Sequence, residues 1–159
     1  LAALAQAAIG QRNNQMTPLQ MAMIAAGIAN DGTVMTPYLI NRVLAPDGDV
    51  IEETEPEELS EAISPEVAQK LQEMMVSVVE NGTATAARIP GVRVAGKTGT
   101  AEHGEAAAPH AWFISFAPAD DPKVAVCVFV ESGSAGVGAA GGGTAAPIAK
   151  DVMQAVLSR

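Results

Sequence analysis

The sequence predicts an α/β protein of the α+β type, in which an antiparallel sheet is covered by helices. Two apolar, β-branched segments, 111–116 and 124–130, are separated by a short turn rich in Pro and Asp, which predicts an antiparallel pair of strands. Three segments with helical start signals, at 17–29, at 64–80 and from Thr144 onward, predict helices beside this pair. The 159 residues, of which 48% are hydrophobic, are suited to a single buried core.

The first predicted helix begins after Thr17. Thr17 can cap the helix, Pro18 suits its first turn, and Gln20 stands at the reciprocal position of a capping box. Apolar residues continue to Ala29 and predict a mostly buried helix, with a broad stripe formed by Met16, Leu19, Met23, Ala26 and Ile28. The sequence Asn30-Asp31-Gly32 ends it, because these residues tolerate a left-handed conformation.

A hairpin is predicted after the first helix. The β-branched and aromatic content rises from Val34 to Val43, and Pro46-Asp47-Gly48-Asp49 is typical of a turn leading into Val50-Ile51. The stretch from Asp47 to Glu66 holds nine of the 18 acidic residues and no Lys or Arg. This charge pattern predicts a solvated, mobile excursion over about 47–63.

The second predicted helix begins at Ser64 and ends at Asn81-Gly82, with one apolar face formed by Val67, Leu71, Met74, Met75 and Val78. Small residues over 83–91 predict a turn or a short helix. The glycine-rich segment 133–143 is expected to be a loop. Thr144 is expected to cap the last helix, whose apolar residues are Ile148, Val152, Met153, Val156 and Leu157.

Composition excludes several classes of function. A formal net charge of -9 would repel a phosphate backbone, so nucleic acid is not an expected partner. A single cysteine rules out an internal disulfide and a cysteine-based zinc site. No apolar run reaches the roughly 18 residues of a spanning helix. Because the chain starts at Leu1 without a basic flank, we expect it to be a piece of a longer protein.

One motif has two interpretations. Residues Gly91 to Thr98 satisfy the written phosphate-loop pattern G-x-x-x-x-G-K-[ST], which indicates nucleotide binding. A phosphate loop also needs a hydrophobic strand before its first glycine and a helix after its last residue. Pro90 and small residues precede Gly91, and Gly99 disfavours a helix afterwards. The nucleotide interpretation therefore stays as an alternative.

The second interpretation places the same residues on a strand. Val92 and Val94 alternate into Lys97-Thr98-Gly99-Thr100, which would send Lys97 and Gly99 to one face and both threonines to the other. Gly99 would let a ligand or another chain approach the backbone closely. Two hydroxyls and a cation can bind a carboxylate. This interpretation predicts an anion-binding strand.

Several segments resemble the transpeptidase domain of class B penicillin-binding proteins. In chain order they are Ile9-Gly10-Gln11, 17–22, 28–32, Lys97 to Glu102, 109–113, 116–118 and Ala145-Ala146-Pro147-Ile148. The resemblance covers nearly the whole chain and implies the fold of penicillin-binding transpeptidases and serine β-lactamases. It also implies a D,D-transpeptidase that cross-links peptidoglycan stem peptides through an acyl-serine intermediate and is acylated by β-lactams.

The resemblance implies roles for four residues. Lys97 and Thr100 would be catalytic: Lys97 supplies positive potential and hydrogen bonds to the proton-relay groups, and the Thr100 N–H completes the oxyanion hole. Thr98, Gly99 and Thr100 would bind the substrate, with the two hydroxyls on the terminal carboxylate of the peptide or drug. No metal and no organic cofactor is implied.

The catalytic serine of the family is not found in this chain. In the family it lies in an S-x-x-K motif, and none of the chain's serines is followed three places on by Lys or two places on by Asn. We therefore expect 1–159 to be the C-terminal portion of the domain, with the nucleophile upstream, and the isolated chain to be inactive. A sensor that binds β-lactams or muropeptides without turnover is the other alternative.

The family also implies partners and a location. Stem peptides and β-lactams are the expected ligands, and cell-wall synthesis or division proteins are expected partners. An upstream anchor outside this chain would hold the protein in the cytoplasmic membrane of a bacterium, with the catalytic domain outside the cytoplasm.

Three further residue types attract attention and are expected to be structural. Cys127 lies in an apolar strand, where burial raises a thiol pKa. His103 and His110 are expected at a loop or strand end, without a metal. Trp112 is expected in the core.

Overall fold

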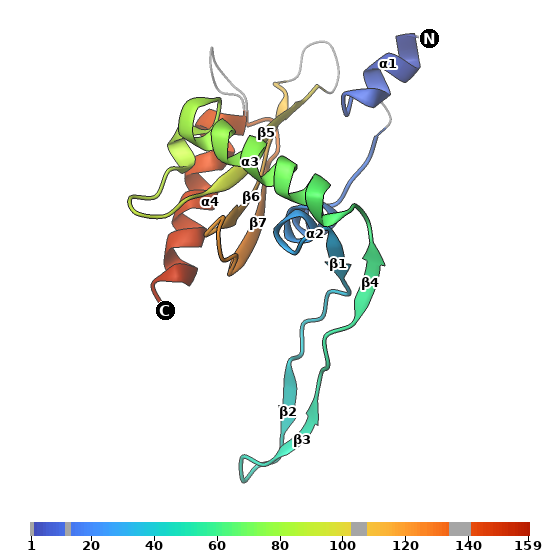
Figure 1. Ribbon diagram of the computed structural model, residues 1–159, viewed down its shortest axis with the longest axis vertical. Coiled ribbons are helices and arrows are strands. Elements are labelled where there is room, and N and C mark those ends of the chain that lie inside the picture. The colour runs from blue at the N-terminus through green and yellow to red at the C-terminus, as the bar shows by residue number, and fades with distance from the viewer. Residues whose placement is uncertain (1, 12–13, 103–107, 134–140) are drawn as a thin grey trace.

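The computed structural model describes residues 2–11, 14–102, 108–133 and 141–159. Its centre is an antiparallel sheet of three strands, β5 (Ala95–Ala101), β6 (His110–Ala117) and β7 (Val124–Val130), in the order β5-β6-β7 (Figure 1). As predicted, β6 and β7 form an antiparallel pair, and the strand with the Lys-Thr-Gly sequence joins them at one edge. The Ala117–Pro118 peptide bond in the turn after β6 is cis.

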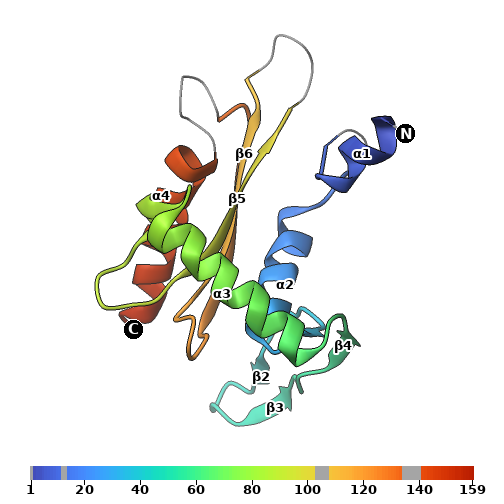
Figure 2. The ribbon, with the colours of Figure 1, turned by 45° about the horizontal axis from the view of Figure 1, so that its top comes forward.

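Helices cover both faces of this sheet (Figure 2). Helix α4 (Gly141–Leu157) lies on one face, and helix α2 (Pro18–Ala29) lies on the other. Helix α3 (Pro65–Asn81) packs on β5 and α2, and the 3-10 helix η1 (Thr85–Ala87) contacts α4. Helix α1 (Ala2–Ala8) lies near the start of the chain. No helix among the described residues is long and apolar enough to cross a membrane.

Strand β6 separates two hydrophobic cores, because its side chains alternate between the two faces. The core under α4 includes Val79, Val94, Ala111, Phe113, Ala145, Ala149 and Met153. The core under α2 and α3 includes Ala25, Met75, Val76, Ala95, Ile114 and Phe116. Phe113 and Phe116 are both fully buried, on opposite faces. The sheet is therefore buried on both sides.

A second part of the chain projects from this body as an arm, which we define as residues 33–61 (Figure 1). Strand β1 (Thr33–Met35) pairs with β4 (Glu58–Glu61), and β2 (Arg42–Leu44) pairs with β3 (Val50–Glu53), both antiparallel. The predicted hairpin is confirmed. Strands β3 and β4 lie within the predicted acidic excursion of about 47–63 and are exposed, whereas its predicted mobility stays a prediction. Cross-strand backbone bonds hold these acidic residues while their side chains stay exposed.

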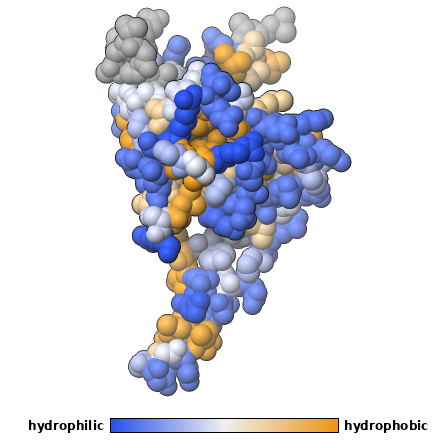
Figure 3. Space-filling model, turned by 60° about the vertical axis from the view of Figure 1, so that its left-hand side comes forward, coloured by the Kyte–Doolittle hydropathy of each residue, from blue (hydrophilic) through white to orange (hydrophobic). Residues whose placement is uncertain are grey.

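The arm displays hydrophobic side chains on its surface (Figure 3). The most exposed ones are Tyr38, Leu39, Ile40, Leu44, Val50, Ile51 and Leu59. All residues of β2, β3 and β4 are exposed. No helix among the described residues covers these strands, unlike the strands of the central sheet.

The predicted helices exist, and Met75 and Met153 are buried as predicted, but much of the buried faces differs from the prediction. Helix α2 has the predicted Thr17–Gln20 capping box, and it buries Ala25 and Gly27 while Leu19 is exposed. The buried residues of α3 are Ala68, Met75, Val76 and Val79, and those of α4 are Gly141, Gly142, Ala145, Ala146, Ala149 and Met153. Small side chains let each helix approach its neighbours closely. Ala and Gly therefore occupy much of the contact faces for which the sequence predicts larger residues.

Helix α4 also begins earlier than predicted, at Gly141 and not after Thr144. The Thr144 hydroxyl donates to the Gly133 carbonyl at 2.9 Å, so it does not act as the predicted cap. A Cβ atom at Gly141 would overlap the Trp112 carbonyl oxygen, and one at Gly142 would overlap the Thr83 carbonyl oxygen. Close packing on the sheet therefore overrides the low helix propensity of glycine here.

Candidate functional site

Strand β5 carries the four residues predicted to form the site. Lys97 is paired with Ile114, and Thr98 is paired with Phe113. Cross-strand partners share a face of the sheet. Lys97 and Gly99 therefore belong to the face covered by α2, whereas Thr98 and Thr100 belong to the face covered by α4. The predicted alternation along this strand is confirmed.

The strand geometry of β5 argues against the phosphate-loop interpretation. Residues Ala95–Ala101 form one continuous strand, so the lysine and threonine of the pattern do not lead into a helix. Gly91, with a φ of 77°, lies in a tight turn closed by a β-bridge between Ile89 and Val92. Over the described residues 89–101 the backbone therefore lacks the helix N-terminus that holds phosphates in such loops.

Strand β5 is an edge strand of the sheet, so no other strand among the described residues pairs with its outer edge. Lys97 and Thr100 are exposed and Thr98 is half-buried. The Lys97 ammonium donates to the Thr98 carbonyl at 2.6 Å, which places a positive charge beside the strand backbone. An exposed strand edge with backbone donors, backbone acceptors and an adjacent cation can bind an extended peptide that carries a negative charge.

Gly99 is packed on both faces. A Cβ atom at this position would lie 3.1 Å from the Trp112 Cβ atom on one side. On the other side, the start of α4 lies so close that a Cβ at Gly141 would be 3.1 Å from the Gly99 nitrogen. The segment that approaches the Gly99 backbone in this structure is the first turn of α4, and the close approach of a ligand or another chain stays a prediction.

Gln11 contacts the end of β5, a contact that no local sequence pattern predicts. Its side-chain nitrogen donates to the Thr100 carbonyl at 3.1 Å, and its side-chain oxygen accepts from the Glu102 N–H at 3.2 Å. One amide group thereby pairs with two backbone groups as a neighbouring strand would. The only sequence signal was its place in the Ile9-Gly10-Gln11 segment of the family resemblance.

Thr83 is a second residue that sequence reasoning missed. It follows α3, and its hydroxyl oxygen lies 2.8 Å from the Thr98 hydroxyl oxygen, at hydrogen-bond distance. In the sequence Thr83 lies in a small-residue segment that predicted only a turn or short helix. The segment also places the Thr83 hydroxyl beside Thr98, which is predicted to bind the carboxylate.

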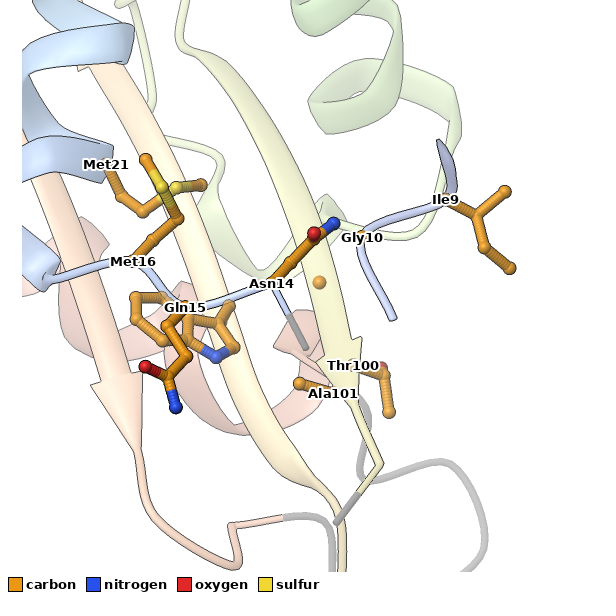
Figure 4. Close-up of a pocket in the computed structure, with 10 residues that line it drawn as sticks. Ile9, Gly10, Asn14, Gln15, Met16, Met21, Thr100 and Ala101 are labelled. Carbon is orange, nitrogen blue, oxygen red and sulfur yellow. The ribbon is translucent and has the colours of Figure 1, made fainter. Parts of the chain in front are cut away.

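A pocket of about 500 Å³ lies beside the end of β5 (Figure 4). Residues from β5 and β6 form one wall, including Gly99, Thr100 and Trp112. The segment before α2 and the first turn of α2 supply the rest, namely Ile9, Gly10, Asn14, Gln15, Met16 and Met21. The methionines predicted to pack in the core therefore line a mostly apolar pocket next to the candidate strand.

The remaining candidates have structural surroundings. The Ser132 N–H donates to Nδ1 of His110 at 3.1 Å, and the His110 ring contacts Phe129. The Trp112 and Phe129 rings are 4.5 Å apart, and Trp112 is half-buried and lines the pocket, so its predicted place in the core is wrong. Burial raises the pKa of the Cys127 thiol, as predicted. His103 and most of the predicted glycine-rich loop, 134–140, lie outside the described residues.

Comparison with known proteins identifies the family. The penicillin binding protein transpeptidase domain family matches residues 1–154. The chain is 50% identical to the peptidoglycan D,D-transpeptidase PbpA of Mycolicibacterium smegmatis, with 98% of this chain and 32% of that protein covered. It is 48% identical to PbpA of Mycobacterium tuberculosis over the same shares. The chain belongs to the penicillin-binding protein transpeptidase domain family, and the family resemblance is confirmed.

Solved structures agree with this assignment. The crystal structure of PBPA from Mycobacterium tuberculosis matches with a TM-score of 0.91 at 48% identity, and covers 98% of this chain and 38% of its own length. The penicillin G acyl-enzyme complex of that protein matches with a TM-score of 0.86 at 46% identity, over 98% of this chain and 35% of its own. The predicted fold class is thereby confirmed. This chain spans about a third of the length of these curated relatives.

Proposed function

We propose that this chain is the C-terminal portion of the transpeptidase domain of a penicillin-binding D,D-transpeptidase that cross-links peptidoglycan stem peptides. The support is the family membership, together with relatives named peptidoglycan D,D-transpeptidases. The related PBPA of Mycobacterium tuberculosis has been solved as a penicillin G acyl-enzyme complex. This supports β-lactams as covalent ligands of the complete protein that contains this chain. The observation that carries the proposal is the exposed strand edge with Lys97 and two threonines.

The proposed reaction has two steps. A serine oxygen attacks the carbonyl carbon of the terminal peptide bond, the C–N bond breaks, and the departing amino acid takes up the serine proton through a relay. An amine of a second stem peptide then attacks the acyl-serine ester, which forms a new peptide bond and returns a proton to the serine. With a β-lactam, the ring C–N bond breaks and the ring nitrogen takes the proton, so nothing leaves.

In this proposal β5 forms one wall of the active site. Lys97 supplies positive potential and hydrogen bonds to the proton relay, and the Thr100 N–H stabilises the tetrahedral oxyanion. The Thr98 and Thr100 hydroxyls bind the terminal carboxylate, and Gly99 lets the ligand approach the strand backbone closely. One oxyanion donor of this kind contributes about 2.7–4 kcal/mol to transition-state stabilisation. No metal or organic cofactor takes part.

The nucleophile belongs to another part of the protein. No S-x-x-K and no S-x-N sequence occurs in the chain, so we propose that both motifs lie upstream of residue 1. We place the complete protein in the cytoplasmic membrane of a bacterium through an upstream anchor. Its catalytic domain would lie outside the cytoplasm, in contact with cell-wall synthesis or division proteins.

Labelling with penicillin tests the proposal. The complete protein should gain the mass of one penicillin G molecule, and it should transfer the acyl group of a D-Ala-D-Ala stem peptide to an acceptor amine. The 159-residue chain alone should show no adduct by intact mass. An adduct on the isolated chain would contradict the upstream nucleophile. A stable adduct without any peptide transfer would favour the non-catalytic sensor, and nucleotide-dependent thermal protection without an adduct would favour a nucleotide-binding protein.

A further inference from the structure

Thr83 is held in place by the two elements that meet beside β5. It follows Gly82, whose N–H donates to the Val78 carbonyl at the end of α3, and it precedes the fully buried Ala84. The first turn of α4 packs on the Thr83 carbonyl so closely that only a glycine is accommodated at position 142. The Thr83 backbone therefore has little freedom beside the strand.

The Thr83 side chain meets Thr98 on the face of β5 that also carries Thr100. The two hydroxyl oxygens are 2.8 Å apart, and either one can be the donor. A hydroxyl has one proton to donate and can accept two hydrogen bonds. If Thr98 gives its proton to Thr83, it has only lone pairs left for a ligand. If Thr83 donates, Thr98 keeps its proton for the ligand.

We propose that Thr83 is a positioning residue that donates to Thr98, so that the Thr98 hydroxyl donates to the carboxylate of the bound peptide or β-lactam. This inference rests on the proposed function. A carboxylate accepts hydrogen bonds only, so it favours the direction in which protons run from Thr83 through Thr98 to the ligand. Each hydrogen bond in such a chain strengthens the next. Thr83 then acts on carboxylate recognition without touching the ligand.

The test compares an acid with its ester in the complete protein that contains this chain. The probes are penicillin G and its methyl ester, and the readout is the second-order rate constant of acylation. Wild type should prefer the acid. Thr83→Val, which keeps the shape and removes the hydroxyl, should lower acylation by the acid about tenfold, as expected for one hydrogen bond that supports a charged group. Acylation by the ester should stay within twofold, and Thr83→Ser should restore the wild-type preference.

A double-variant cycle sharpens the test. Thr98→Val should reduce the preference for the acid at least as much as Thr83→Val does, and adding Thr83→Val to it should change the rate no further, because Thr83 acts through Thr98. Equal losses with acid and ester in Thr83→Val, or an unchanged preference, would overturn the inference. If Thr83→Val unfolds, Thr83→Ala is judged by the same two probes. A wild-type protein that neither probe acylates would instead overturn the proposed function, and the inference with it.

Discussion

The central sheet and the arm are both antiparallel β-structure made of similar residues, yet their surroundings differ. In the sheet, β6 has fully buried residues on each face, among them Phe113 and Phe116. In the arm, every residue of β2, β3 and β4 is exposed, Ile51 by 66%. The difference lies in the helices, which cover both faces of the sheet, whereas the arm packs on α2 through β1 and leaves β2, β3 and β4 exposed.

This contrast shows that strand pairing and strand burial have separate causes. The strand pairs of the arm depend on local turns. In the turn around Gly48, for example, the Ala45 N–H donates to the Asp49 carbonyl. Two-stranded hairpins are at best marginally stable in water on their own. The stability of this protein should therefore come from the sheet, where the candidate strand also lies.

The largest effect is expected for a truncation in the sheet. Phe113→Ala removes a fully buried ring under α4, and the free energy of unfolding should fall by about 3–5 kcal/mol. The matched control, Ile51→Ala in the arm, should change it by less than about 0.5 kcal/mol. Denaturant unfolding of the complete protein measures both. Similar losses at the two positions would show that the arm is covered in the complete protein.

A second pair of variants separates steric overlap from backbone strain. In Gly142→Ala the new methyl would meet the Thr83 carbonyl, and overpacking should cost about 1–3 kcal/mol. At Gly48 in the arm nothing lies within 4 Å, but its φ is +94°, so Gly48→Ala should cost only about 1 kcal/mol. Thermal unfolding compares the two. A larger loss at Gly48 than at Gly142 would contradict the close packing of α4 on the sheet.

The thiol in the sheet gives a pH-dependent probe. Burial raises the pKa of Cys127, so the folded protein holds the thiol proton more tightly than the unfolded chain does. The contribution of the protonated Cys127 thiol to the free energy of unfolding is fully present below the pKa of the unfolded chain. It is lost as the pH rises through the pKa of the folded protein. Iodoacetamide should therefore alkylate Cys127 several-fold more slowly in the folded protein than in denaturant, with a shift of the pH profile to higher pH. Equal rates would show an open sheet face.

The smallest effect is expected when the arm is removed. Residues 37–56 can be replaced by a two-residue Asn-Gly turn, because Thr36 is already bonded to the Glu57 carbonyl at 2.8 Å. Penicillin acylation of the complete protein should stay within twofold, since β5 packs mainly on β6, α3 and α4 and not on the arm. A large loss of acylation would place the arm in the active site and end the contrast between the two regions.

Much of the fold was predictable because its signals are local. The Thr17 capping box, the turn around Gly48 and the alternation of Lys97 and Thr98 each depend on residues a few positions apart. The faces that the helices bury were not predictable in the same way. Leu19 is exposed and Ala25 is buried, because close contact between neighbouring elements selects the small side chain.

The candidate site shows the same division. The sequence by itself determined that the two threonines share one face if the Lys97 to Thr100 segment is a strand, since alternation is a property of the extended backbone. The structure decided between this strand and a phosphate loop. Only the tertiary structure decided that Gln11, 89 residues away, pairs with the Thr100 carbonyl and that Thr83 meets Thr98. Such contacts depend on how helices and loops pack against the sheet, and no pattern within a short segment specifies that arrangement.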